Sequence, residues 1–443
     1  MATRTLLSLP EELIDHICWK LVGHPHSRSI DTLYDPKSLS SLCRVSKSLN
    51  RIAMPVLYAR FDAMERMKRT ADFLRTISLR PELGGYVQEA TFSMFNWFPL
   101  TEDHLKVFTE AATRLGVSLD DWMENYPFEA VVQLIIAQTP NVRTIDVAAH
   151  EVYADDGAGA FTILEQIAAQ VPPRISLPHL ERLSVGHDDC RRISLGYFGG
   201  IIELAPYIRE ITMSPCYGLQ CDEKHVNNRL TLKNVTNLQL DGGHISKLEL
   251  ESIVRLCGGL ENFDYGYHSI YAGLSHACVT PREVIEILMP HNNTLRSISI
   301  NLGWREREHP TSFSFSGLCT DGDQIISLKN FSRLETFRVD GTSLLFPEVQ
   351  KPGYHTNILI NLLPTSIRCF HLANAQRESV ANLITLTDSI ADFPFLKEIS
   401  LTGNSVNGPL GEEEVVLDES EMSTLRKILS DKGIKFEEMS VWE

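Results

Sequence analysis

The sequence has no long hydrophobic run. None of its 443 residues belongs to a stretch of about 18 apolar residues, the length that a membrane-spanning helix requires. The first residues also lack the apolar segment of a secretory signal and reach the acidic Glu11 and Glu12 early. These absences predict a protein of the cytoplasm or the nucleus, where its nine cysteines stay reduced.

The sequence also lacks the signatures of common catalytic classes. It has no Gly-x-x-x-x-Gly-Lys phosphate loop, no His-Glu-x-x-His, no Gly-x-Ser-x-Gly and no Gly-x-Gly-x-x-Gly. His187 and Cys190 are close in the chain, but Asp188 and Asp189 beside them oppose formation of a reactive thiolate. We therefore expect a protein that is not an enzyme and needs no cofactor.

The cysteines do not show the regular spacing of a metal site. Cys216, Cys221 and His225 come closest, but no fourth ligand is evident and the spacing does not fit a zinc knuckle. We expect no metal site. Cys18 and Cys257 stand in apolar patterns that predict small buried side chains, and Cys369 does too.

Hydrophobic residues make up 43% of the chain and charged residues 22%, which is typical of a folded globular protein. The net charge of −16 is unevenly distributed: residues 1–80 hold 13 Lys and Arg against 8 Asp and Glu, a net charge of +5. The rest of the chain carries −21. This acidic body disfavours nonspecific binding to nucleic acid or to an anionic membrane.

Residues 8–55 carry three helical patterns. Ser8 and Glu11 predict a capping box around Pro10, after which apolar residues follow at helical spacing to Leu21. A second helix is predicted after Asp35 as its cap, with Pro36 in the first position. The third is predicted to begin at a Ser46 cap and to end at Pro55.

The apolar residues of this head follow a known motif. The matching positions are Leu9-Pro10-x-Glu12-Leu13-Ile14-x-x-Ile17, Ser38-Leu39-x-x-Leu42-Cys43-x-Val45-Ser46-Lys47 and Ile52-Ala53-x-Pro55-x-Leu57-Tyr58. This combination resembles an F-box, and the closing Pro-x-Leu-Tyr is similar to many fungal members. Two positions depart from the family: the loop between the first two helices is longer, and Asn50 stands where many members have Trp.

The resemblance implies that residues 1–62 bind the Skp adaptor, and through it the cullin, of an SCF-type ubiquitin ligase. The residues implied to form or support this docking surface are Leu9, Pro10, Leu13, Ile14, Ile17, Leu39, Leu42 and Val45. A three-helix unit of about 60 residues cannot bury all its apolar side chains, so some must meet a partner or the rest of the chain. The alternative is that these residues only cap the first repeat of the body.

A short pattern recurs through the body: an apolar residue, two variable residues, then two apolar residues around a variable one. Nine copies begin 25 to 39 residues apart, at Val142–Val147, Leu180–Val185, Ile208–Met213, Val235–Leu240, Leu260–Tyr265, Leu295–Ile300, Leu334–Val339, Ile367–Leu372 and Leu396–Leu401. Weaker copies occur at Val87–Phe92 and Phe436–Val441. The alternation predicts strands.

Amphipathic segments between the copies predict helices, at 128–139, 161–171, 248–257, 281–289, 355–363 and 422–429. A strand and a helix repeated this often resemble a leucine-rich-repeat solenoid. A doubly wound domain also alternates strand and helix, but nine units exceed its usual sheet. We therefore expect an α/β fold: the three-helix F-box, a connecting helix or linker at 63–80, and over 81–443 a horseshoe with a parallel concave sheet.

Side chains alternate along a strand, so the variable positions are predicted to face the concave side. Those predicted to bind a protein client are Asp146, Arg182, Glu210, Asp241, Asp264, Arg338, Asp340, His371 and Glu398. Glu89 and Glu438 belong to the same set. Eight acids against two Arg predict an acidic face and a basic client. The alternative is that the charges only keep an exposed sheet soluble.

Loops that leave the strands offer a second candidate binding surface. Aromatic residues and Arg cluster there, in 92–98, 265–271 and 303–323. For the whole chain, two functions stay open. The first is a substrate receptor of an SCF-type ubiquitin ligase. The second is an interaction protein or scaffold that acts outside ubiquitination.

Overall fold

A computed structural model describes most of the chain. The described residues are 6–21, 36–63, 67–93, 100–119, 127–148, 161–186, 194–214, 216, 218, 230–241, 245–266, 279–302, 322–344, 357–375, 377–403 and 419–439. They form two compact units. Unit 1 comprises Met1–Asp189 and Tyr197–Ile208, and unit 2 comprises Cys190–Gly196 and Arg209–Glu443.

In unit 1 the helices are α1 (Glu11–Lys20), α2 (Pro36–Val45), α3 (Lys47–Ala59), α4 (Met67–Leu79), α5 (Pro81–Gly84), α6 (Glu102–Leu115), α8 (Pro127–Ala137), α9 (Thr162–Ala168) and α10 (Gly199–Leu204). In unit 2 they are α11 (Lys247–Leu256), α12 (Pro281–Leu288), α13 (Gly341–Leu344), α14 (Ile358–Leu362), α15 (Arg377–Asp388) and α16 (Glu419–Asp431). Short 3₁₀ helices are η1 (Leu6–Ser8), η2 (Leu195–Phe198), η3 (Met289–His291) and η5 (Ile390–Asp392).

The strands of unit 1 are β1 (Arg60–Asp62), β2 (Glu89–Ser93), β3 (Thr144–Ala148) and β4 (Arg182–Gly186). The strands of unit 2 are β5 (Glu210–Ser214), β6 (Asn237–Leu240), β7 (Asn262–Gly266), β8 (Ser297–Asn301), β9 (Thr336–Asp340), β10 (Cys369–Ala375), β11 (Glu398–Gly403) and β12 (Lys435–Met439). Within each unit every strand pairs in parallel with the next one along the chain.

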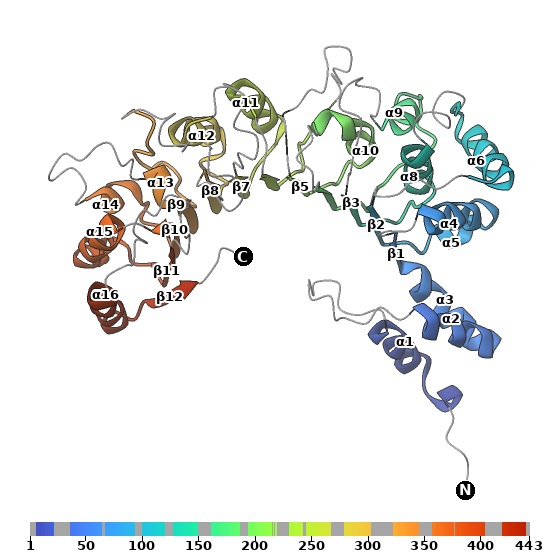
Figure 1. The fold of residues 1–443 in the computed structure, drawn as a ribbon, viewed down its shortest axis with the longest axis horizontal. Coiled ribbons are helices and arrows are strands. Elements are labelled where there is room, and N and C mark those ends of the chain that lie inside the picture. Colours follow the sequence, from blue (N-terminus) through green and yellow to red (C-terminus); the bar gives the residue numbers. More distant parts are fainter. Residues whose placement is uncertain are drawn as a thin grey trace, which may run out of the picture. The chain divides into compact units, whose positions relative to one another are not determined.

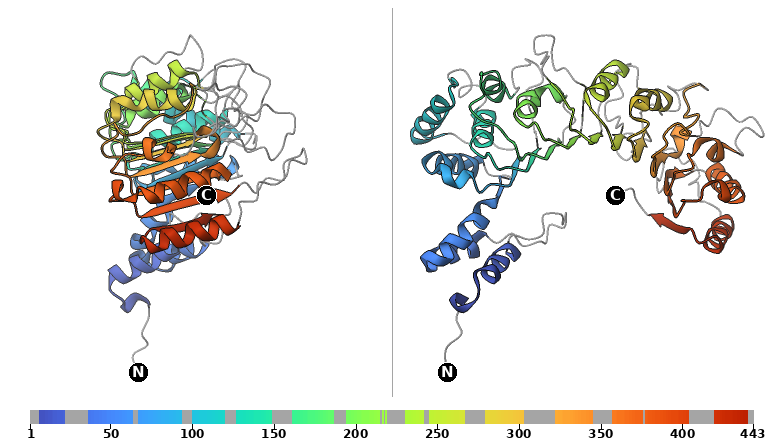
Figure 2. Two further views of the ribbon diagram at one scale, coloured as in Figure 1. Left: turned by 90° about the vertical axis from the view of Figure 1, so that its left-hand side faces the viewer. Right: turned by 180° about the vertical axis from the view of Figure 1, so that it is seen from behind.

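Parallel neighbours need a crossover, and between most successive strands a described helix forms part of it. Between β5 and β6, and between β8 and β9, the described residues contain no helix. In each unit the described helices that connect strands lie on one side of the sheet, and no described helix covers the opposite side of the strands (Figures 1 and 2). We call this helix-free side the open face. The chain is therefore an α/β protein in which strands and helices alternate over most of the described residues, as the repeat predicts.

The repeated frame explains why these segments form strands. Its first apolar residue is buried in all nine clear copies, as with Val142 and Leu295. The two later apolar positions point toward the helices and are buried as well, as with Ile145 and Val147 in β3. The variable positions between them face the open side. Strand period and burial of one side thus fix both secondary structure and orientation.

Capping residues in the sequence account for several helix starts. The side chains of Thr101, Ser246 and Thr280 each accept a hydrogen bond from the backbone N–H of the residue three positions later. The side chain of that later residue accepts a hydrogen bond from the backbone N–H of the capping residue. These capping boxes begin α6, α11 and α12 and satisfy backbone N–H groups that have no partner within the helix. The six helices predicted between the repeats are present, with ends within a few residues.

The ends of the repeat array differ from the sequence prediction. β1 directly follows the head, although no strand is predicted there, and it pairs with β2 in the register Arg60 to Glu89. The last frame is shifted by three residues: Phe436 pairs with Ile399, which is the fourth position of its own frame. A shift by an odd number turns each side chain to the other side of the sheet, so the predicted frame at Phe436–Val441 is wrong.

The head forms its own small core. Ile14 and Cys18 of α1, Leu39 of α2, and Leu49 and Ala53 of α3 are all buried in it. As predicted, α2 begins at Pro36 and α3 has a Ser46 cap, whose hydroxyl accepts the Leu49 N–H at 3.1 Å. Asp35 lies outside the described residues.

Two details of the head contradict the prediction. The N-cap of α1 is Pro10, and Leu6–Ser8 form a 3₁₀ turn before it, so Ser8 is not the N-cap that the sequence predicts. Pro55 does not end α3, which continues to Ala59. A proline without N–H removes one helical bond but does not prevent the next turn when the helix packs on both sides of it.

Candidate functional site

Apolar side chains remain exposed on the head. We call the residues Leu9, Leu13, Ile17 and Val45 the head stripe; 38%, 51%, 38% and 66% of their surfaces are exposed. Leu9, Leu13 and Ile17 follow one another at intervals of four residues, so Leu13 and Ile17 lie side by side on α1 and Leu9 extends the row beyond its start. Val45 ends α2.

The residues beneath the stripe are buried. Ile14 and Leu39, two of the residues that the resemblance implies for docking, have almost no exposed surface, and Leu42 is partly buried against the same core. They hold α1, α2 and α3 together. Of the implied residues, Leu9, Pro10, Leu13, Ile17 and Val45 are therefore the ones that a partner could contact directly.

A different part of the head joins the body. α3 packs on α5 and continues into β1. There Phe61 stacks on Phe73 of α4 with ring centroids 4.0 Å apart, and Tyr58 lies against the same ring at 6.3 Å. The head stripe contributes to none of these contacts and is exposed. Capping of the first repeat thus falls to the C-terminal half of α3.

Asn50 has a structural role in the head. Its side-chain amide donates to the backbone carbonyl oxygen of Cys43 at 2.9 Å and so connects α3 to the last turn of α2. That bond satisfies one of the carbonyl oxygens that a helix end leaves without an internal partner. Arg51 of α3 forms an ion pair with Glu11 of α1. The three helices are thereby linked by polar contacts as well as by their core.

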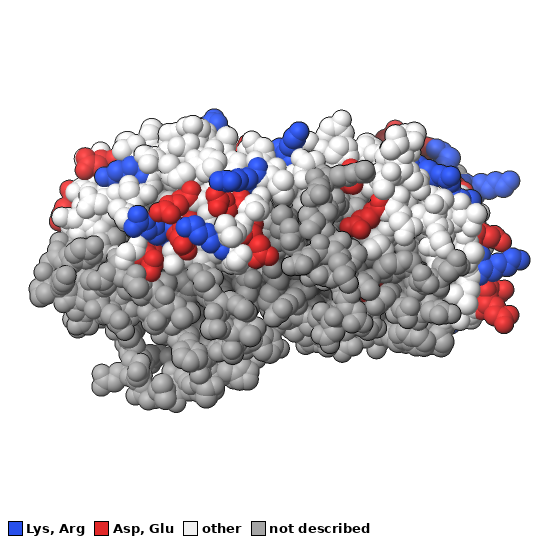
Figure 3. All heavy atoms as spheres, turned by 90° about the horizontal axis from the view of Figure 1, so that it is seen from above, with Lys and Arg blue, Asp and Glu red and all other residues white. Residues whose placement is uncertain are grey.

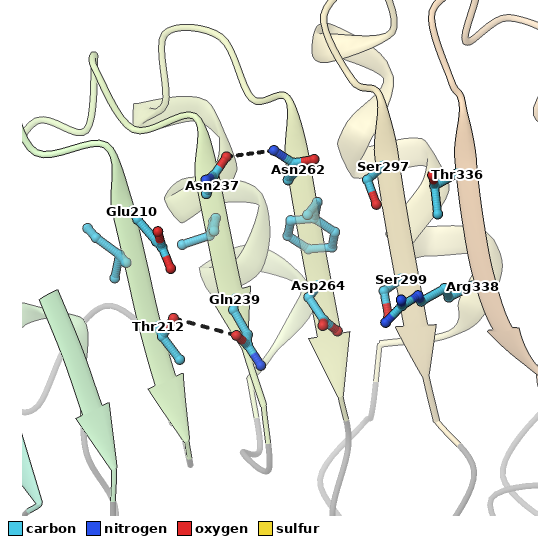
Figure 4. A pocket seen from close by; sticks show the side chains of 13 residues that line it. Glu210, Thr212, Asn237, Gln239, Asn262, Asp264, Ser297, Ser299, Thr336 and Arg338 are labelled. Atoms are coloured by element: carbon cyan, nitrogen blue, oxygen red, sulfur yellow. Dashed lines mark hydrogen bonds between the residues drawn. The ribbon is translucent and has the colours of Figure 1, made fainter. Parts of the chain in front are cut away.

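The open face of unit 2 forms a hollow across β5, β6, β7, β8 and β9, with a volume of about 440 Å³. We call it the groove. Its polar side chains come from the third and fifth positions of successive frames. They are labelled in Figure 4: Glu210, Thr212, Asn237, Gln239, Asn262, Asp264, Ser297, Ser299, Thr336 and Arg338. The residues lie in register on neighbouring strands, so segments far apart in the chain form one surface.

Amides and hydroxyls dominate the middle of the groove. The Asn262 side-chain amide donates to the Asn237 side-chain oxygen at 2.7 Å, and the Thr212 hydroxyl donates to the Gln239 side-chain oxygen at 3.5 Å (Figure 4). Each of these amides is both a donor and an acceptor and can make further hydrogen bonds on its open side. The groove therefore offers a polar, largely uncharged floor.

Asp264 is the carboxylate at the centre of the groove. Burial raises its pKa to about 6; the Ser299 hydroxyl, which donates to it, and the charge of Arg338 act in the opposite direction, while Asp241 raises the pKa further. Figure 4 shows the Arg338 side chain extending across β8 toward Ser299. The carboxylate is thus held in a site where its negative charge is only partly compensated.

No protein-family model matches the sequence, and the search of characterised proteins found no significant similarity.

The other predicted client-binding residues lie on the open face in separate places. In unit 1, Asp146 accepts a hydrogen bond from Ser184 and lies near Arg182, and burial raises the pKa of its carboxyl. In unit 2, Glu398 lies 3.8 Å from the ammonium of Lys435. His371 contacts the Ser400 hydroxyl, and its pKa is lowered first by burial and then by Arg338.

Two of the predicted acids, Asp340 and Glu438, are not available on the open face. Asp340 is completely buried, and its carboxylate accepts the backbone N–H of Leu302 at 2.8 Å, so its prediction as a binding residue is wrong. It occupies the position after the last apolar residue of the frame, where the alternation ends. Asp241 follows β6 at the same position and is half-buried. Glu438 forms an ion pair with Arg426 of α16 on the helix side.

These positions change the predicted charge of the open face. Without Asp340 and Glu438, and with Glu89 in an ion pair with Arg60, the described part of the open face is not strongly acidic. The groove contains two carboxylates, Glu210 and Asp264, against the guanidinium of Arg338. The sequence prediction names only charged side chains and therefore omits the neutral polar residues of the groove. These residues occupy the third and fifth positions of the frames, the same positions as Glu210 and Asp264.

The remaining predicted sites give no second centre in the described part of the chain. Phe92 and Tyr265 are buried in strands, and the other aromatic residues named in the loops lie outside the described residues, as do His187, Cys190, Cys221 and His225. Cys18 and Cys257 are buried as predicted, whereas Cys369 is half-buried. Among the described residues, no three His, Cys, Asp or Glu side chains form a metal-binding group.

Two further observations concern the surface. None of the described helices has the length and hydrophobicity needed to span a bilayer. The face of the molecule seen in Figure 3 carries Lys and Arg interspersed with Asp and Glu, without a large region of one sign in its described part. The mixed charges do not mark a charged interface on the described part of that face.

Proposed function

We propose that this chain is the substrate-recognition subunit of an SCF-type ubiquitin ligase. In this proposal residues 1–62 are an F-box that binds the Skp adaptor, and the rest is a leucine-rich-repeat-like solenoid whose open face binds a protein client. The chain performs no chemistry itself, because it brings the client close to the catalytic subunits. The exposure of the head stripe at F-box motif positions is the observation that carries the proposal.

The apolar surface of the head lies away from the first repeat. A head that served only as a cap would bury Leu13 and Ile17 against the first repeat. Instead these side chains are exposed, while Ile14 and Leu39 beneath them are buried. Burial of an apolar side chain in an interface contributes about 1.5–3 kcal/mol when it is complete. A row of such side chains on a folded helix is therefore a favourable docking surface.

Adaptor binding tests the proposal. The full chain, co-expressed with the Skp adaptor, is expected to form a complex that is stable through size-exclusion chromatography. The double variant Leu13→Asp, Ile17→Asp is expected to weaken this complex at least about 100-fold, since two apolar contacts are lost and two charges would be buried. The affinity is measured by titration calorimetry or by surface plasmon resonance.

A matched control keeps this experiment specific. Leu105 on α6 and Leu248 on α11 are also exposed leucines on helices, with 38% and 75% of their surfaces exposed. The double variant Leu105→Asp, Leu248→Asp adds the same charges to the body and is expected to leave adaptor affinity unchanged. A wild-type chain without affinity for the adaptor, or equal affinity of both double variants, contradicts the docking proposal.

The alternative is an interaction protein that acts outside ubiquitination. It predicts the same open-face binding without cullin in the complex. Addition of the cullin to the purified pair separates the two functions: a complex of three components supports the ligase, and a complex that excludes cullin supports the alternative. A protein that accumulates when this chain is deleted would then be a candidate client.

A further inference from the structure

We propose that the groove binds an extended segment of the client that presents a Lys or Arg side chain to Asp264. The inference rests on the proposed function for the origin of the ligand, because the segment belongs to the client. It adds the class of ligand and the residue that selects it.

The shape of the groove favours a peptide over a small molecule. Pockets for small molecules are mostly enclosed and apolar, whereas this hollow lies on the face of an open sheet and is lined largely by polar side chains. From β5 to β9 there are four strand spacings of about 4.8 Å, or about 19 Å in total. An extended chain of six residues spans about the same length at about 3.3 Å per residue.

The hydrogen-bonding groups of the floor match a peptide backbone. Asn237, Gln239 and Asn262 carry side-chain amides, each with a donor and an acceptor like the peptide group itself. Their mutual bonds leave donor and acceptor positions on the open side, and the hydroxyls of Thr212 and Ser297 can take either role. Such groups bind a backbone without selecting the sequence. Selection must come from the charged residues.

The charges favour a basic side chain. Glu210 and Asp264 lie in the groove, and Asp241 lies close enough to Asp264 to act on its carboxyl. Arg338 is the single cation among the described residues that line the groove, and it extends toward Ser299, on the β8 side of Asp264. The ammonium or guanidinium of a ligand placed on the β6 side of Asp264 would supply the compensation that the fold leaves incomplete.

The test uses the full chain and hexapeptide libraries, with one position fixed in turn as Arg, Lys, Gln or Glu and the others randomised. The immobilised protein retains peptides from each library, and mass spectrometry measures the retained fraction. For at least one fixed position, we expect at least about tenfold greater retention of Arg or Lys than of Gln or Glu. Asp264→Asn is expected to reduce this ratio to less than about twofold.

Two further variants make the result independent of folding defects. Arg338→Gln removes the competing cation and is expected to increase retention of basic peptides, a gain that a misfolded protein would not show. Glu437→Gln removes an open-face carboxylate of β12, outside the groove, and is expected to leave the ratio unchanged. Equal retention of all four libraries, preference for Glu, or an unchanged ratio in Asp264→Asn overturns the inference.

Adaptor affinity, measured on the same preparations, separates this inference from the ligase proposal. A wild-type chain that retains basic peptides but does not bind the adaptor keeps the inference about the groove and refutes the docking role of the head. A chain that binds the adaptor but shows no preference for basic peptides keeps the docking role of the head and refutes the inference about the groove.

Discussion

Asp264 on β7 lies directly beside Ser299 on β8, and the serine hydroxyl donates a hydrogen bond to its carboxylate. The same arrangement occurs in unit 1, where Asp146 on β3 lies beside Ser184 on β4. In both pairs burial raises the carboxyl pKa more than the hydroxyl lowers it. An acid whose charged form is disfavoured by its own fold reduces stability, and such residues are common where a ligand completes the site.

The first prediction concerns the pH dependence of stability. The pKa of Asp264 is about 6 in the folded chain, above the ordinary value of 3.8. Between these values the native state binds more protons than the unfolded state, so this group makes stability fall as pH rises from about 4 to about 6. We expect Asp264→Asn to be more stable than the wild type at pH 7.5, by about 1–3 kcal/mol, and similar to it at pH 4.

Denaturant unfolding at both pH values measures this difference. Asp146→Asn provides an independent comparison, because its pKa is raised by the same cause, and its effect on stability is expected to have the same sign. A difference between Asp264→Asn and the wild type that grows as pH falls would show that the carboxylate is stabilised by the fold rather than strained by it.

The second prediction separates the core of the head from its surface. Leu39→Ala removes a completely buried side chain and is expected to cost about 2–5 kcal/mol. Val45→Ala, on the same helix but two-thirds exposed, is expected to cost less than about 1 kcal/mol. Hydrogen exchange of the α2 and α3 amides reports the stability of the head itself. Equal protection in the two variants would contradict the described packing.

The third prediction concerns close contact between successive repeats. A Cβ atom on Gly258 would lie 2.3 Å from the backbone oxygen of Lys233 in the preceding repeat, a contact that backbone atoms cannot relieve without moving. We expect Gly258→Ala to destabilise unit 2 by about 1–3 kcal/mol. Gly322→Ala is the matched control, because no atom lies within 4 Å of its added Cβ. Chemical denaturation that shows equal stability of both variants would exclude this contact.

The fourth prediction concerns thiol reactivity. Burial raises the pKa of both Cys216 and Cys257 to about 12, so the reactive thiolate is nearly absent at pH 8. In the native chain both are expected to resist alkylation by iodoacetamide, whereas in the denatured chain they react. Peptide mapping by mass spectrometry measures the labelling. Rapid modification of either residue in the native chain would show that its surroundings open to solvent.

Much of the fold follows from local patterns. The alternation in frames such as Leu180–Val185 predicts both the strand and its buried side, because a strand has a period of two and one side must leave water. Capping residues such as Ser46 predict helix starts in the same way. The end of the array is less predictable: Phe436 is compatible with two frames, and its pairing with Ile399 decides between them.

The sequence by itself determined most of the strand and helix pattern, the apolar core positions and the three helices of the head. The tertiary structure alone decided which apolar residues of the head stay exposed and which acids are buried. Leu13 is accessible and Ile14 is not, and the buried carboxylate of Asp340 accepts the backbone N–H of Leu302. It also created the groove, by placing Asn237 beside Asn262 and Asp264 beside Ser299. The physical reason is that alternation along one strand is local, whereas burial and lateral neighbours depend on residues 25 to 39 positions away in the chain.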